Sequence, residues 1–94
     1  TMLPHVMRFN LDVSNERYGD VGLALGVTSN ALDAIEAVES LSATVGTDRT
    51  LTDLGATKND IEHLTTDALR DLIILNTPRY PNRADVRGLY ELAL

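Results

Sequence analysis

The clearest apolar pattern lies near the middle of the chain. Thr28 or Ser29 is placed to cap the start of a helix there, and Gly46 is placed to end it. Between them, apolar side chains recur at steps of three and four, which is the spacing of one helix face. The pattern therefore predicts a helix over residues 30–45. Its inward face consists of Ala31, Ala34, Ile35, Val38, Leu41 and Val45.

A second apolar stripe follows in the C-terminal half. Thr57 and Asp60 resemble a capping box in which Asp replaces the usual Glu. Pro78 cannot continue a helix, and the residue before a proline avoids the α region, so this helix should end near Asn76. The stripe expected to face the core is Ile61, Leu64, Ala68, Leu72 and Leu75.

The N-terminal segment, residues 3–10, reads as the last part of a buried helix that Asn10 can end. Leu3, Val6 and Met7 (or Phe9) are expected on its inner side. Pro4 either begins this helix or belongs to a kinked helix whose first half is absent, because proline lacks an N–H and crowds the preceding turn.

Two further helices are predicted. The first covers about residues 16–25 and ends at Gly26, with Tyr18, Val21 and Leu25 inward. Its two internal glycines each cost roughly 1 kcal/mol relative to alanine, so another backbone is expected to pack closely against them. The second is capped by Asn82 and turns Val86, Leu89, Tyr90 and Ala93 to the core.

No stretch alternates apolar and polar residues with a period of two, which is the signature of a half-buried strand. We therefore predict an all-α fold, an irregular bundle of about five helices. Residues 1–94 form a single helical domain or part of one, since 94 residues is close to the usual size of one domain.

Composition narrows the possible functions. The net charge is −6, with 14 acidic and 8 basic side chains, which argues against nucleic-acid binding. Residues 51–69 could pass for a helix-turn-helix, but acidic residues along the second helix would repel phosphates. There is no cysteine for a disulfide or thiolate zinc site, and no apolar run approaches the roughly 20 residues that span a bilayer. We expect a soluble, cytoplasmic protein without membrane partners.

The two histidines do not suggest a metal centre. A metal site needs about three or four converging ligands. His5 has no partner at helical spacing, and His63 has only Asp67 four residues on. A hydrogen-bonded His5 and a solvated His63 are the favoured interpretations.

Several motifs, in order along the chain, carry a family resemblance. They are LPHVMRFN at residues 3–10, YGDVGLALG at 18–26, LTDLG at 51–55, residues 61–71, and NTPR at 76–79. Together they resemble the C-terminal helical domain of iron-containing (group III) alcohol dehydrogenases, which share the dehydroquinate-synthase-like fold. The resemblance covers nearly all 94 residues.

The resemblance implies a function for a longer protein. Such enzymes use NAD or NADP and a divalent metal, iron or zinc, to transfer a hydride between a nicotinamide and an alcohol–aldehyde pair. Their metal ligands, one Asp and three His, and their nucleotide-binding turn lie upstream of the segment that contains His5. We therefore expect that the nucleotide-binding domain and the metal-bearing helices, which lie upstream in the family, are absent from this chain. The chain alone is expected to be inactive. It would hold no catalytic, cofactor-binding or metal residue.

The resemblance also points to residues 72–79, whose counterpart approaches the substrate cleft. Thr77 stands where the family usually has Asn. Ile73 would make that wall of the cleft apolar. The alternative, which we favour, is that Ile73, Ile74 and Leu75 are ordinary core, with Leu72 core under either interpretation.

The expected partner is the remainder of its own polypeptide. Surface intended for missing helices, around Leu3, Val6 and Met7, would also favour self-association. The alternative function is a stand-alone helical interaction or regulatory module without catalysis.

Overall fold

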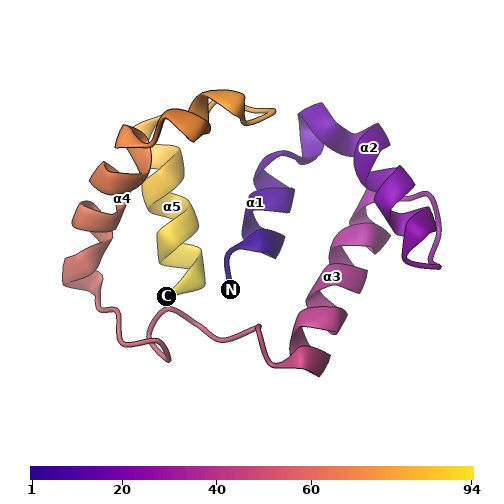
Figure 1. Cartoon of the computed structure of the whole chain (residues 1–94), viewed down its shortest axis with the longest axis horizontal. Coiled ribbons are helices and arrows are strands. Elements are labelled where there is room, and N and C mark those ends of the chain that lie inside the picture. Colours follow the sequence, from indigo (N-terminus) through magenta and orange to yellow (C-terminus); the bar gives the residue numbers. More distant parts are fainter.

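The computed structural model describes residues 1–72 and 74–94, and it is all-α over these residues (Figure 1). It confirms the predicted fold class. The helices are α1 (Leu3–Phe9), α2 (Leu11–Ala24), α3 (Ala31–Val45), α4 (Ile61–Arg70) and α5 (Arg83–Ala93), with the short 3₁₀ helices η1 (Lys58–Asp60) and η2 (Leu72–Asn76).

The helices form two pairs with α1 between them. Helix α2 packs on α3, and α4 packs on α5, while α1 contacts both α3 and α5 (Figure 1). The molecule measures 39 × 28 × 17 Å. Its thickness of 17 Å is only about one and a half helix diameters, so the helices lie nearly in a single layer.

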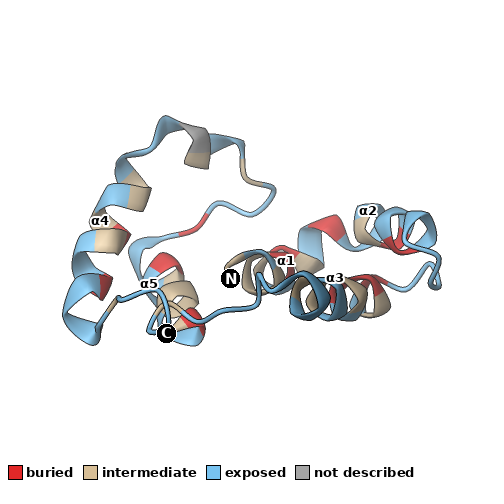
Figure 2. Ribbon diagram, turned by 60° about the horizontal axis from the view of Figure 1, so that its bottom comes forward, coloured by how far each residue is buried: buried red, intermediate tan, exposed pale blue. Residues whose placement is uncertain are grey.

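The core is correspondingly small. Figure 2 shows its buried residues dispersed over the helices and not gathered in one centre. They come from every α-helix, and the buried apolar ones are Met7, Ala31, Ala34, Ile35, Ile61, Val86 and Ala93.

Helix α1 begins at Leu3 with Pro4 in its first turn, where a missing N–H costs nothing, and Asn10 ends it as predicted. Met7 is buried and Val6 is half-buried. The inward placement of Leu3 is wrong, since 58% of this residue is exposed. Leu3 lies at the first position of a short helix in a thin molecule, where no second layer covers it.

Helix α2 differs most from its prediction. It starts at Leu11, five residues early, and contains a kink at Ser14 (φ −123°, ψ 17°). Val21 and Leu25 are exposed, contrary to expectation, and only Tyr18 of the predicted three is even half-buried. The buried residues of α2 are Ser14, Gly19 and Gly22, so glycine forms the face that packs.

The close backbone approach predicted at these glycines is confirmed. A Cβ added to Gly22 would lie 2.5 Å from the carbonyl oxygen of Thr28 and 3.3 Å from the Ala34 side chain. A Cβ at Gly19 would meet the carbonyl oxygen of Ser29 still more closely. The link from α2 to α3 therefore folds directly over the surface of α2.

Helix α3 matches its prediction in extent, and Gly46 ends it with a positive φ of 79°. The cap is Asn30, not Thr28 or Ser29: its Oδ1 accepts a hydrogen bond from the Leu32 N–H at 2.8 Å. The face is buried only at its N-terminal end, and Leu41 and Val45 are exposed. That end packs on α2, whereas the C-terminal turns extend beyond it (Figure 1).

The prediction for α4 is right at its start and wrong at its end. The Thr57 N–H donates to Asp60 Oδ2 at 2.7 Å, as the capping pattern indicates. The α-helix ends at Arg70, since Asp71 is extended (ψ 119°). Leu72 and Leu75, assigned to the core, are 79% and 59% exposed. The break and the tighter 3₁₀ turn rotate these side chains off the stripe.

Helix α5 confirms its prediction. Asn82 caps it, accepting from the Asp85 N–H at 2.9 Å, while the Asp85 carboxylate accepts from the Asn82 N–H at 3.0 Å. Val86 and Ala93 are buried, and Leu89 and Tyr90 are half-buried. These side chains pack toward α4 and α1.

A first prediction separates close-packed from open glycines. Gly22→Ala should lower the free energy of unfolding by about 1–3 kcal/mol, because the new methyl group collides with backbone that cannot move aside cheaply. Urea denaturation followed by circular dichroism measures this.

The matched control is Gly88→Ala in α5, where an added Cβ meets nothing within 4 Å. That change should raise the unfolding free energy by about 0.5–1 kcal/mol, the helix-propensity gain. Equal effects of the two substitutions would contradict the packing described for α2.

A second prediction concerns pH. The Thr50 and Thr57 backbone N–H groups hold the pKa values of Asp53 and Asp60, respectively, below the ordinary 3.8, with further lowering by the two threonine hydroxyls. A folded pKa below the unfolded one stabilises the fold above about 3.8, and this contribution disappears as the pH falls through the lower folded value.

Asp60→Ala should therefore lower the urea midpoint at pH 6, and the difference from the unmodified chain should shrink between pH 4 and pH 2. Asp20→Ala, an exposed carboxylate within α2, serves as the control. A difference for Asp60→Ala that stays constant down to pH 2 would contradict the assignment.

Candidate functional site

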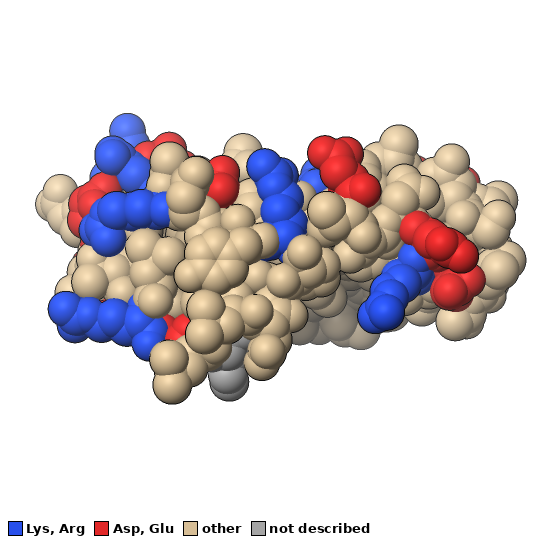
Figure 3. Space-filling model, turned by 90° about the horizontal axis from the view of Figure 1, so that it is seen from above, with Lys and Arg blue, Asp and Glu red and all other residues tan. Residues whose placement is uncertain are grey.

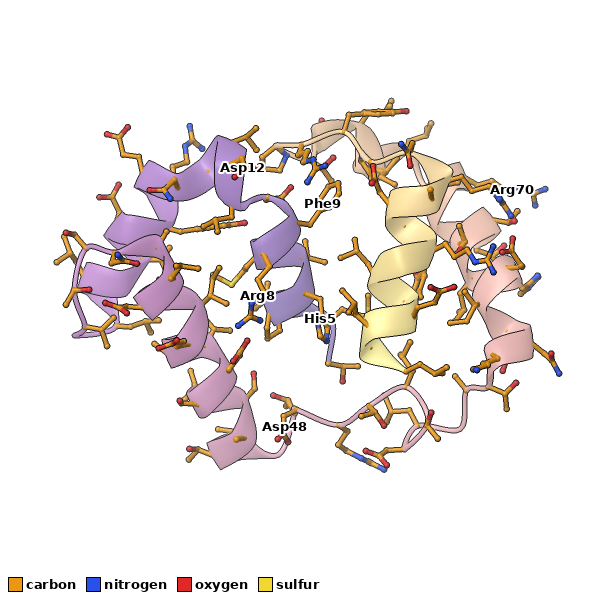
Figure 4. All side chains as sticks on the ribbon, turned by 180° about the vertical axis from the view of Figure 1, so that it is seen from behind. His5, Arg8, Phe9, Asp12, Asp48 and Arg70 are labelled. Atoms are coloured by element: carbon orange, nitrogen blue, oxygen red, sulfur yellow. The ribbon has the colours of Figure 1, made fainter. Side chains whose placement is uncertain are left out.

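The two histidines lie far apart in the fold. His5 is on α1 and borders an open groove beside α5 (Figure 4). His63 is on the exposed face of α4, where its Nε2 lies 3.3 Å from Asp67 Oδ2. His63 and Asp67 are solvated as predicted, with more than half of each side chain exposed.

The described residues do not fit a metal ion. No group of three or more histidine and acidic side chains converges within residues 1–72 and 74–94. Two ligands on an exposed helix face are fewer than a stable site requires. The divalent metal that the resemblance implies therefore has no ligand set in the described part of this chain.

A largely apolar hollow lies where α1 meets residues 74–81 and α5. A cavity of about 180 Å³ lies at this junction. Phe9 and Asn10 line it from the end of α1, Ile74 and Arg79 from the link, and Leu89 from α5.

Arg79 holds the link against α1. Its Cζ lies 4.1 Å from the centroid of the Phe9 ring, and its Nη1 donates to the Phe9 carbonyl oxygen at 3.1 Å. The first contact is a cation–π interaction, and the second satisfies a carbonyl at the C-terminal end of a helix, where positive charge is favourable. This contact could not be predicted from the sequence, because Phe9 and Arg79 are 70 positions apart.

Asn10 was predicted only to end α1, but it is also buried. It is 5% exposed, and its Oδ1 has no hydrogen-bond partner within the described chain. Buried side-chain acceptors are nearly always paired, so this oxygen is unusual. A polar residue between the apolar Phe9 and Leu11 was the available sequence signal.

Ile73, the suggested cleft-wall residue, lies outside the described residues. Its neighbour Ile74 is half-buried and lines the cavity, in partial agreement with the core interpretation. Leu75 is exposed, so the core interpretation is wrong for that residue.

The surface offers no concentrated positive charge on the face drawn in Figure 3, where basic and acidic side chains are interleaved. The ion pairs Glu62–Arg83 and Glu62–Arg87, at 3.0 and 3.2 Å, likewise set acidic beside basic side chains. Among the described residues, every helix is too short or too polar to cross a membrane.

Comparison with known proteins gives consistent matches over the whole chain. The model of the "Fe-containing alcohol dehydrogenase family, C-terminal" matches residues 1–94. Lactaldehyde reductase of Escherichia coli K12 is 36% identical over 99 residues, covering 98% of this chain and 26% of the relative. The probable alcohol dehydrogenase EutG of the same organism is 39% identical over 93 residues, covering 98% and 24%.

A third relative, 1,3-propanediol dehydrogenase of Citrobacter freundii, is 30% identical over 99 residues, again with 98% of this chain covered and 26% of the relative. The chain thus spans about a quarter of the length of the curated relatives it matches. It belongs to the Fe-containing alcohol dehydrogenase family and corresponds to the C-terminal part of that family's proteins.

Proposed function

We propose that this chain is the C-terminal helical part of an NAD(P)-dependent alcohol dehydrogenase that transfers a hydride between a nicotinamide and an alcohol–aldehyde pair. The observation that carries the proposal is the family match over all of residues 1–94. The names of relatives support it, since they include a lactaldehyde reductase and an NAD-dependent methanol dehydrogenase.

In this proposal the metal, iron or zinc, and the nicotinamide are held by polypeptide outside the chain. A divalent metal in such enzymes supplies Lewis-acid polarisation of the substrate oxygen. The chain's own contribution is structural: Arg79 fixes residues 74–81 against α1, next to the segment in which the resemblance places the cleft wall. The cleft-wall role of Ile73 stays a prediction.

The dimensions of the chain support a partner that covers one of its faces. Its accessible surface is 6202 Å², whereas a folded monomer of 10.3 kDa exposes about 5,400 Å². The excess of roughly 800 Å² is close to what one partner buries in a standard interface. The radius of gyration is 14.1 Å, whereas a compact domain of 94 residues has a radius of gyration of about 12 Å.

The test of the proposed function is the reading frame that encodes the chain and the protein it specifies. A frame that continues upstream of Thr1 through one Asp and three His ligands, and whose product oxidises small alcohols with NAD⁺ or NADP⁺, supports the proposal. A start codon at Met2 would contradict it.

The third prediction is that the 94-residue chain alone neither oxidises alcohols nor retains a metal after dialysis, because its described acidic and histidine side chains do not converge. Metal analysis and a nicotinamide absorbance assay measure both properties. Stoichiometric iron or zinc that is lost in His5→Ala but kept in His63→Ala would overturn this prediction.

The fourth prediction is that the isolated chain self-associates through the exposed side of α1. Of the three residues expected there, Met7 is buried and Val6 is half-buried, so Leu3 is the one that remains exposed. Leu3→Asp should weaken association by about tenfold or more, since a buried leucine contributes roughly 1.5–3 kcal/mol. Sedimentation equilibrium measures the change.

Leu54→Asp is the control, because Leu54 is 56% exposed against 58% for Leu3 but lies in the turn before α4. An unmodified chain that stays monomeric at millimolar concentration, or equal effects of both substitutions, would exclude this surface.

A further inference from the structure

The cavity between α1, residues 74–81 and α5 has the properties of a small-molecule site. Its volume of about 180 Å³ is similar to the roughly 150 Å³ of an interior cavity that holds benzene, and it is partly open at the surface. Val6, Val86 and Leu89 give it apolar walls from two different helices. Small-molecule sites typically combine such walls with a few polar groups that fix the orientation of the ligand.

The polar groups of the link are already engaged. The Thr77 hydroxyl lies 2.8 Å from the Ile74 carbonyl oxygen and 3.2 Å from that of Arg79. One Arg79 N–H donates to the Phe9 carbonyl oxygen, and the guanidinium lies over the Phe9 ring. These contacts hold the link beside the cavity.

Asn10 is different, because its buried Oδ1 has no partner in the described chain. The lining of the cavity is mostly apolar, and no described residue donates to this oxygen. The last torsion of an asparagine side chain is soft, so the oxygen can turn toward a donor in the cavity that Asn10 lines. The missing partner is thus one donor on an otherwise apolar body.

We propose that this cavity binds a compact apolar molecule that carries a single N–H or O–H donor, with Asn10 Oδ1 as the acceptor. The proposal concerns a site made entirely by this chain, and it does not depend on the dehydrogenase function. Indole and indene form a matched pair of probes, since they share one shape and only indole has an N–H.

The experiment is a titration of the full 94-residue chain with each probe, followed by the NMR signals of the Val6, Val86 and Leu89 methyl groups. Indole should shift these signals saturably. Indene should bind about tenfold more weakly, which is the effect of one hydrogen bond to a buried acceptor. This comparison requires no variant and therefore does not depend on one that folds.

Two variants locate the site. Asn10→Ala, which suits the right-handed backbone at this position (φ −85°, ψ −1°), should abolish the preference for indole and keep indene binding. Val6→Phe should fill the cavity and abolish both. The absence of saturable methyl shifts with indole, or equal binding of indole and indene by the unmodified chain, overturns the proposal.

Discussion

The arrangement depends on a seven-residue helix. A helix as short as α1 is not stable alone in water, because isolated helices below about 12–15 residues are marginal. It persists here because Met7 is buried, Arg8 forms an ion pair with Glu39 on α3, and Arg79 clasps its C-terminal end. In turn α1 contacts both α3 and α5, and so it connects the two helix pairs. Each side of the molecule is therefore stabilised through the same short element.

The pair α2–α3 is held by close packing of the link between the two helices against α2. The stretch 27–30 joins two helices that must lie against each other, so its carbonyl groups pass directly over α2. Gly19 and Gly22 make room for them, at a cost in helix propensity that packing against Ala34 helps to offset. This is why the apolar residues Val21 and Leu25 are exposed while glycines are buried.

Features with a local cause could be predicted from the sequence. Some features depend on residues within one or two turns, and the structure confirms them: the Thr57–Asp60 capping pair, the Asn82 cap, the stop at Gly46 and the face of α5. Leu72 was misassigned because periodicity was extended across Asp71, where the backbone leaves the helix.

The candidate cavity was not predictable at all in this way. The contact of Arg79 with Phe9 beside it joins residues 70 positions apart, and Asn10 is buried only in the folded chain. Only the choice of a polar residue at position 10 was visible beforehand, and that residue has an equally good explanation as a helix end. Sequence reasoning also located Ile73 through the family resemblance alone, and the described residues leave that role as a prediction.

The thin, nearly single-layer arrangement of the helices explains why other apolar residues that the sequence pattern places in the core are exposed. A helix in a single layer has neighbours only at its sides, so a wide apolar stripe is covered in part and its remainder meets solvent. Leu41 and Val45 are exposed for this reason, although 44% of the chain is apolar. In a free-standing domain, apolar side chains left exposed in this way would not stabilise the fold, because their burial is the main driving force for folding. It is the pattern expected if a second layer of polypeptide covers one face, and for this reason it supports the proposal of a larger dehydrogenase over that of a self-contained helical module.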